Sequence, residues 1–214
     1  MSATTRWSLA ALIVALAVGV GLWRQLDSPA PPAQRGGPPV VAEQPAGDRA
    51  APAEVRAAAD LAPCPEGDGG AGPEPLRGIE VRCAADGAPI DVAPALAGRP
   101  VVLNLWAYWC GPCRDELPAM AEYQHRAGPE VTVLTVHQDP NEAAGLALLT
   151  ELGVRLPTLQ DGERRIAAAL RVPNVMPATV VLRADGTVGE VLPRAFTTAD
   201  EIAAAVEREL GESR

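Results

Sequence analysis

Short apolar runs alternate with longer amphipathic stretches over most of the chain, starting near residue 76. Three apolar runs predict strands, and the first of them is apolar enough to be buried on both faces: residues 101–106, 131–136 and 178–182. Three longer stretches have the periodicity of amphipathic helices: residues 111–127, 142–152 and 198–210. The last of these helices has a capping-box start, with Thr198 followed three residues later by Glu201.

Two Asp-Gly pairs predict hairpin turns, since both residues tolerate the backbone angles of tight turns. Asp86-Gly87 lies between apolar segments at 79–82 and 90–92, and Asp185-Gly186 follows the strand that ends at 182. The remaining predicted elements are minor or terminal: a strand at 188–192, a short strand near 158–159 and helices at 54–61 and 163–170. Strands alternating with helices predict an α/β fold, a central mixed sheet flanked by helices with an N-terminal hairpin.

The N-terminal region, residues 1–26, contains an uncharged apolar run of 17 residues from Trp7 to Trp23. As a helix this run would span roughly 25 Å, a little less than a hydrocarbon core of ~30 Å. Tryptophan at both ends suits the two membrane interfaces. We therefore expect a single-pass transmembrane anchor. The alternative is a signal peptide that is cleaved to give a secreted protein, and either segment would export the rest of the chain.

A proline-rich linker is expected at residues 27–60, followed by a folded domain at 61–214. Seven prolines fall between residues 27 and 53, and an extended chain of this kind reaches up to roughly 80 Å. The net charge is −9, and every basic residue is arginine. Without a basic stripe to neutralise phosphates, the sequence argues against a nucleic-acid partner.

Cys110 and Cys113 enclose Gly111 and Pro112 at the junction between the buried strand and the helix that follows it. The free N–H groups and the dipole of a helix start favour a thiolate. We expect Cys110 at the exposed tip as the attacking thiolate, and Cys113 one turn deeper as the resolving thiol. The pair is able to attack a disulfide and then resolve the mixed intermediate.

Two further cysteines, Cys64 and Cys83, bracket a loop rich in glycine and proline. In an exported protein we expect them to form a structural disulfide, worth about 3 kcal/mol for a loop of ~20 residues. Two alternatives stay open: Cys83 serves as a thiol relay, or all four cysteines hold zinc in a non-catalytic binding module. We assign no metal and no cofactor.

The run from Val101 to Pro118, VVLNLWAYWCGPCRDELP, resembles the thioredoxin-like proteins of the TlpA/ResA type, the membrane-tethered thiol–disulfide oxidoreductases of bacteria. The resemblance covers about residues 76–212 and implies a thioredoxin-like fold with a helical insertion near 141–152. It implies a reductant of protein disulfides outside the cytoplasm, for example in cytochrome c-type biogenesis on apocytochromes c. Such a reductant takes its electrons from a membrane donor, and we expect a monomer.

The resemblance also implies roles for single residues. Pro177, just before the strand at 178–182, corresponds to a cis-proline that faces the active disulfide, and backbone groups of Met176 would then pair with a substrate peptide. Glu116 falls where an acid tunes the thiols and relays a proton; an ordinary acid in a first helical turn is the alternative. Asn104 replaces the buried aspartate of thioredoxin proper and cannot accept a proton.

The surface around the cysteines is expected to bind substrate through Trp109, Gly111, Pro112 and Met176, with Trp106 in the core. The histidines, His125 and His137, receive no role. The Gly-Pro dipeptide matches thioredoxin, whose potential of about −270 mV favours reduction over oxidation. An oxidase or isomerase that uses the same pair of cysteines is the alternative activity. A peroxidase is disfavoured, because Trp109 stands where a threonine would precede the peroxidatic cysteine.

Overall fold

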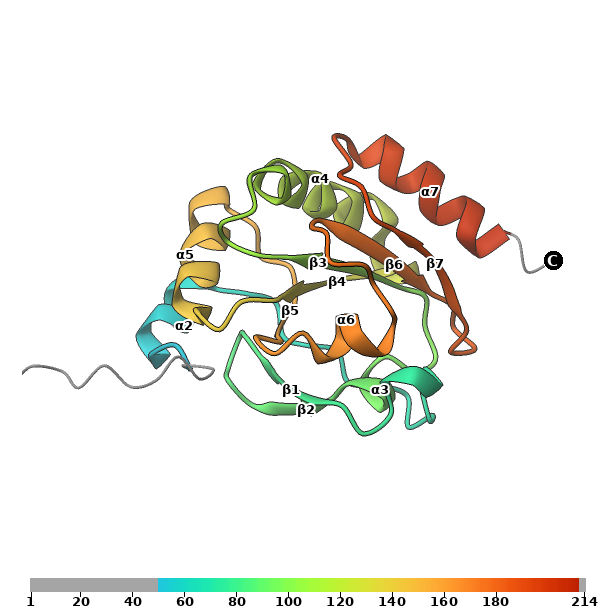
Figure 1. Cartoon of the computed structure of the whole chain (residues 1–214), viewed down its shortest axis with the longest axis horizontal. Coiled ribbons are helices and arrows are strands. Elements are labelled where there is room, and N and C mark those ends of the chain that lie inside the picture. Colours follow the sequence, from blue (N-terminus) through green and yellow to red (C-terminus); the bar gives the residue numbers. More distant parts are fainter. Residues whose placement is uncertain (1–49, 212–214) are drawn as a thin grey trace, which may run out of the picture. The chain divides into compact units, whose positions relative to one another are not determined.

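A seven-stranded mixed sheet organises the part of the chain that the computed structural model describes, residues 50–211 (Figure 1). Its strands lie in the order β2-β1-β5-β4-β3-β6-β7. Their bounds are β1 Glu80–Cys83, β2 Pro89–Asp91, β3 Val101–Trp106, β4 Thr132–His137, β5 Thr158–Gln160, β6 Ala178–Leu182 and β7 Val188–Leu192. The central strands β3, β4 and β5 are parallel, and the outer strands pair antiparallel on both sides.

Six α-helices and two 3₁₀ turns accompany these strands within residues 50–211. Their bounds are α2 Ala53–Ala59, α3 Val92–Ala95, α4 Gly111–Ala127, α5 Glu142–Leu152, α6 Arg165–Ala169 and α7 Ala199–Gly211, with 3₁₀ turns η1 at Glu74–Leu76 and η2 at Gly128–Glu130. The α/β architecture predicted from the periodicity is therefore confirmed. The short helix α3, directly after β2, is an element that the pattern did not predict.

All six residues of β3 are buried, because helices cover both faces of the sheet at its centre. Val101, Leu103 and Leu105 pack with α3 and α6 in one apolar cluster. Val102 and Trp106 belong to the other cluster, together with α4, α7 and part of α5. Figure 1 shows α4 and α7 on one side of the sheet and α6 on the other. Asn104 shares the face of Val102 and Trp106, so alternation along the strand points it toward α4.

The helix α2 belongs to the folded domain, so the boundary that we expected between residues 60 and 61 is placed too late. Arg56 on this helix is largely buried and pairs with Glu142 at the start of α5 (Nη2 to Oε2, 3.0 Å). The backbone N–H of Ala51 donates to the same carboxylate at 2.8 Å. A buried carboxylate needs such partners, and they tie residues 51–59 to the rest of the domain.

The expected anchor at 1–26 and most of the linker lie outside the described residues. Of the helices between residues 50 and 211, none is both long enough and apolar enough to cross a bilayer.

Candidate active site

The Cys-Gly-Pro-Cys segment opens α4, directly after the parallel strand β3 and the short loop 107–109. Cys110 is the N-cap residue, and its Sγ accepts a hydrogen bond from the backbone N–H of Cys113 at 3.2 Å. Such a bond stabilises negative charge on this sulfur. Pro112 lies in the first helical turn, where its missing N–H costs no hydrogen bond. The local sequence thus places Cys110 where its thiolate is favoured.

Cys110 and Cys113 form a disulfide, with an S–S distance of 2.05 Å. Cys110 is only 6% exposed and Cys113 is fully buried. The expected order of exposure holds, but Cys110 is not the exposed tip that we predicted, since Gly111 and Pro112 take that place. Gly111 has open space around its Cα, so a partner chain is able to approach the disulfide closely from this side.

The loop before β6 contributes Met176 and Pro177. The peptide bond between them is cis, the isomer that the resemblance implies. Pro177 is buried, and Met176 packs at the edge of the apolar cluster that contains both Cys110 and Cys113. Met176 and the two cysteines thus share one apolar cluster, although more than 60 positions separate them in the chain.

Two exposed aromatic side chains directly precede this disulfide in the chain. Within residues 50–211, the large hydrophobic side chains with the greatest exposure are Tyr108, Trp109 and Val175. Tyr108 and Trp109 directly precede Cys110, and Val175 lies in the Met176–Pro177 loop. Trp109 is 58% exposed, yet its indole Nε1 donates to Asp139 Oδ2 at 2.9 Å. The hydrogen bond holds the ring in place at the rim.

Glu116 lies one helical turn after Cys113, on the same face of α4, and is fully buried. Its Oε2 accepts from Asn104 Nδ2 at 2.6 Å, and its Oε1 accepts from the backbone N–H of Phe196 at 2.8 Å. Burial raises the pKa of this carboxyl to about 7, although both hydrogen bonds and the charge of Arg194 oppose the rise. A carboxyl with this pKa exchanges protons readily at neutral pH.

Trp106 and His137, at the ends of β3 and β4, are both buried and lie next to each other. Their rings are 4.7 Å apart between centroids, and His137 Nδ1 lies 2.8 Å from Gln160 Oε1. Gly145 of α5 passes so close that a Cβ there would lie 2.8 Å from the imidazole. His137 is thus a core residue that packs α5 against the sheet. His125 lies on the exposed side of α4.

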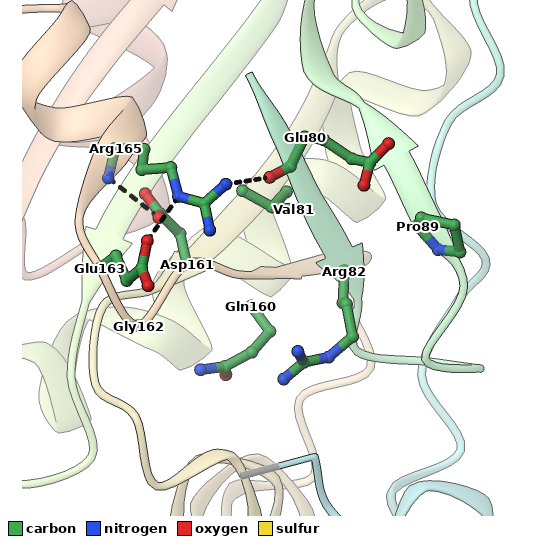
Figure 2. Close-up of a pocket in the computed structure, with 9 residues that line it drawn as sticks. All are labelled: Glu80, Val81, Arg82, Pro89, Gln160, Asp161, Gly162, Glu163 and Arg165. Atoms are coloured by element: carbon green, nitrogen blue, oxygen red, sulfur yellow. Dashed lines mark hydrogen bonds and ion pairs between the residues drawn. The ribbon is translucent and has the colours of Figure 1, made fainter. Parts of the chain in front are cut away.

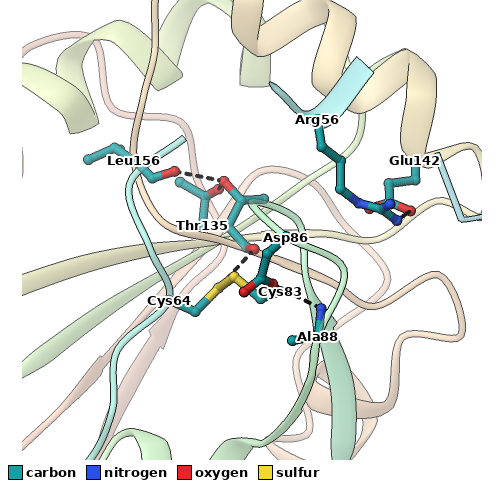
Figure 3. The surroundings of a disulfide bond; sticks show 9 residues. Arg56, Cys64, Cys83, Asp86, Ala88, Thr135, Glu142 and Leu156 are labelled. Carbon is teal, nitrogen blue, oxygen red and sulfur yellow. Dashed lines mark hydrogen bonds and ion pairs between the residues drawn. A yellow bond between two sulfur atoms is a disulfide. The ribbon is translucent and has the colours of Figure 1, made fainter. Parts of the chain in front are cut away.

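Cys64 and Cys83 form the second disulfide, shown in Figure 3. It joins the segment before η1 to the end of β1, and the backbone carbonyl of Thr158 on β5 lies 3.5 Å from Cys64 Sγ. All four cysteines are paired, two by two. Between residues 50 and 211, no three His, Cys, Asp or Glu side chains lie close enough together to hold a metal ion. The arrangement therefore gives no support to the zinc-binding alternative.

A cavity lies away from this disulfide, between β1 and the loop that leads into α6 (Figure 2). Its volume is about 140 Å³, and charged side chains of both signs line it. Arg165 pairs there with Glu163 at 2.8 Å and donates to the carbonyl of Glu80 at 2.9 Å. No residue of this cavity belongs to the loops around Cys110 and Cys113, so we place the site at the disulfide.

Three residues near the disulfide were not found from the sequence: Asp139, Arg194 and Phe196. Asp139 is 30 positions from the tryptophan that it holds, and Phe196 is 80 positions from the carboxylate that it contacts. Phe196 acts through its backbone N–H, for which no side-chain pattern exists. Arg194 stacks over the Phe196 ring at 4.1 Å, and only the tertiary fold brings it near Glu116.

A family model described as AhpC/TSA matches residues 77–191. The chain belongs to the AhpC/TSA family. Within curated proteins, thiol-disulfide oxidoreductase ResA of Bacillus subtilis (strain 168) is 31% identical over 103 residues, which cover 48% of this chain and 57% of ResA. Soluble secreted antigen MPT53 of Mycobacterium tuberculosis (strain ATCC 25618 / H37Rv) is 34% identical over 121 residues, which cover 56% of this chain and 68% of MPT53. The predicted likeness to TlpA/ResA-type proteins is confirmed.

Solved structures place this AhpC/TSA member in the thioredoxin-like fold. A secreted disulfide oxidoreductase of Mycobacterium tuberculosis, described as homologous to E. coli DsbE, superposes with a TM-score of 0.55 at 28% identity. The match covers 63% of this chain and 98% of that one. The thioredoxin-like fold is therefore confirmed. The chain spans little more than half the length of the ResA relatives that it matches.

Proposed function

We propose that this protein is a thiol–disulfide oxidoreductase that reduces disulfides of protein substrates through Cys110 and Cys113. The observation that carries the proposal is the Cys110–Cys113 disulfide at the start of α4, which the exposed aromatic residues Tyr108 and Trp109 directly precede. A disulfide between cysteines three positions apart adds little rigidity to a fold, since it closes a very short loop. The rim suits a protein substrate rather than a small polar molecule.

The reaction begins with the reduced pair. The Cys110 thiolate attacks one sulfur of the substrate disulfide, so a mixed disulfide forms and the other substrate sulfur leaves as a thiolate. Cys113 then gives its proton to Glu116, and the Cys113 thiolate attacks Cys110 Sγ. The bond between Cys110 and the substrate breaks, and the second substrate thiolate leaves. Two electrons have passed to the substrate, and the leaving thiolates take up two protons.

The Met176–Pro177 loop and Trp109 have binding roles in this proposal. Backbone groups of Met176 pair with an extended substrate segment as an added strand. Trp109, with Gly111 and Pro112, contacts the side chains that flank the substrate cysteine. Cys64 and Cys83 take no part in exchange and serve as a structural disulfide.

We place the catalytic domain outside the cytoplasm, as a monomer tethered by the apolar segment at 7–23, and the electrons that restore the dithiol come from a membrane donor. Two disulfides suit an oxidising compartment. The proteins named secreted among its relatives support export. Apocytochromes c are one substrate class compatible with such a reductant.

Trapping tests the exchange reaction. In the full chain, Cys113→Ser retains the attacking thiolate and lacks the resolving thiol, so it accumulates mixed disulfides through Cys110 when given a disulfide-bonded protein. Cys110→Ser is the matched control and accumulates none. Non-reducing electrophoresis and mass spectrometry identify the adducts. Adducts on Cys110→Ser alone would reverse the two roles, and adducts on neither variant would reject the function.

The reduction potential tests the direction. Equilibration with glutathione gives a value below roughly −180 mV for a reductase, while a higher value would assign the site to disulfide formation or isomerisation.

A further inference from the structure

Asn104 is the polar member of the α4-facing side of β3, between Val102 and Trp106. The residue is fully buried, and its Nδ2 donates to Glu116 at 2.6 Å. The other half of the amide is different, because Asn104 Oδ1 is buried without a hydrogen-bond partner within residues 50–211. Leaving a buried acceptor unpaired costs free energy, so its presence calls for an explanation.

We propose that Asn104 positions Glu116 in both of its protonation states, by turning its side-chain amide between a donating and an accepting orientation. With Glu116 ionised, Nδ2 donates to Oε2, as in this structure. With Glu116 protonated on Oε2, a half-turn of the amide presents Oδ1, which accepts the new O–H. Oδ1 then has a hydrogen-bond partner, and Nδ2 takes the position in which Oδ1 had none. The inference rests on the proposed function, in which Glu116 takes the proton of Cys113.

The other oxygen of Glu116, Oε1, has a partner that is able only to donate a hydrogen bond. The backbone N–H of Phe196 donates to Oε1 at 2.8 Å and is unable to accept a proton. The proton is therefore directed to Oε2, on the side of Asn104. The charged group that acts on Glu116 is Arg194, from the loop between β7 and α7. Arg194 lowers the pKa of Glu116 and burial raises it, so both states are populated near neutral pH.

An amide suits this position better than the obvious alternatives. An aspartate would place a second carboxylate against Glu116, and two acids that close cannot both be ionised. A leucine would neither donate nor accept, so Glu116 would lose one of its two donors when charged. Asparagine carries a donor and an acceptor at equal reach from Cβ, and it stays neutral throughout the transfer.

Nuclear magnetic resonance tests the rotation directly. The chain contains three asparagines, Asn104, Asn141 and Asn174. Labelling only asparagine with ¹⁵N in the oxidised full chain, kept in detergent, therefore gives few side-chain NH₂ signals. Asn104→Leu assigns the Asn104 pair by its disappearance. We expect the Asn104 protons to shift with pH at the same midpoint as the Glu116 carboxyl carbon, which is assigned with Glu116→Gln. An Asn104 signal that stays constant while Glu116 titrates would overturn the proposal.

The pKa of Glu116 provides the second readout. In Asn104→Leu we expect it to rise by about one unit, because the ionised form loses a charge-assisted hydrogen bond. Thr135→Val is the matched control. Thr135 lies opposite Asn104 on the neighbouring strand β4, and the substitution removes a buried hydroxyl that pairs with the hydroxyl of Thr158. The control should leave the Glu116 pKa unchanged. Equal shifts in both variants would reduce Asn104 to a packing role and contradict the proposal.

Failure of this inference is distinguishable from failure of the proposed function. The NMR titration is made on the oxidised protein and requires no substrate. Normal trapping by Cys113→Ser with a constant Asn104 signal rejects the inference alone. If the Asn104 signal shifts with pH but Cys113→Ser forms no mixed disulfide with a protein substrate, the amide rotation is supported and the enzyme function is rejected.

Discussion

Arg56 and Glu142 form a buried ion pair between the first helix of the domain and the first residue of α5, with 3.0 Å between Nη2 and Oε2 (Figure 3). The Glu142 side chain is 1% exposed, and it also accepts from the backbone N–H of Ala51 and lies 3.5 Å from Arg82 Nη2. A short alanine-rich helix such as α2 is not stable alone. Its place in the domain therefore depends on this carboxylate.

Replacing Glu142 by Gln tests that dependence. Arg56 would remain buried with its charge uncompensated, so we expect a loss of about 3–5 kcal/mol in the free energy of unfolding. Hydrogen exchange of residues 53–59 should accelerate before the sheet is affected. Glu151→Gln is the control, because Glu151 pairs with Arg114 in an exposed position, and such pairs add little to stability. Equal losses in the two variants would contradict the role of Glu142.

Glu116 makes the stability of the oxidised protein depend on pH. Its pKa is raised from 4.5 in the unfolded reference to about 7 in the folded chain. Between these values the folded state binds more protons than the unfolded state, so stability falls as pH rises. We expect a decrease of roughly 3 kcal/mol from pH 4.5 to pH 7. Denaturant titrations across this range should show that the free energy of unfolding depends less on pH in Glu116→Gln than in the wild type.

Glu201 offers a control of opposite sign. It accepts hydrogen bonds from the backbone N–H and the hydroxyl of Thr197, which lower its pKa. Its contribution is present above its unfolded pKa and is lost as pH falls. Glu201→Gln should therefore weaken the protein at neutral pH and not in acid. If the free energy of unfolding of Glu116→Gln depends on pH as in the wild type, Glu116 is not the source of the pH dependence.

Gly145→Ala should destabilise the protein although alanine is the better helix former. Helix propensity favours alanine by about 1 kcal/mol. The added methyl would lie 2.8–2.9 Å from atoms of the His137 ring, which is buried against Trp106. Overpacking of this kind costs typically 1–3 kcal/mol. Thermal unfolding measures the net effect, and the loss should largely vanish when Gly145→Ala is made in a His137→Ala background.

Removing the Cys64–Cys83 disulfide should weaken the fold and spare the chemistry. The two residues are 19 positions apart, and opening a loop of this size costs about 3 kcal/mol in the chain-entropy model. The double variant Cys64→Ala/Cys83→Ala should therefore unfold at lower denaturant concentration while still reducing a protein disulfide at the wild-type rate. Loss of that activity in a folded double variant would instead favour the relay role of Cys83.

The order of strands and helices was readable from the sequence because periodicity and turn chemistry are local. The run 101–106 became β3 and the stretch 111–127 became α4 with the predicted bounds. The Asp-Gly pairs do lie at reversals of the chain between paired strands. The helix α3 was not predicted, because its four residues, one of them a proline, are too few to show the helical period of 3.6 residues.

The pairing of cysteines was likewise within reach of the sequence. Cys110 and Cys113 share one strand–helix junction, so their proximity follows from local geometry alone. The pairing of Cys64 with Cys83 followed by elimination. The burial of Cys110 did not follow, because the apolar cluster that contains it is assembled from several distant parts of the chain.

By itself, the sequence determined the α/β order, the place of Cys110 and Cys113 and the family likeness, because each depends on residues close together in the chain. Only the tertiary structure decided that Asn104 and Phe196 hold Glu116, that Asp139 holds Trp109 and that α2 docks through Arg56. Each of these contacts joins separate elements, and one is made by a backbone N–H. Proton affinity inside the protein depends on such three-dimensional neighbours and on the exclusion of water, which no local pattern records.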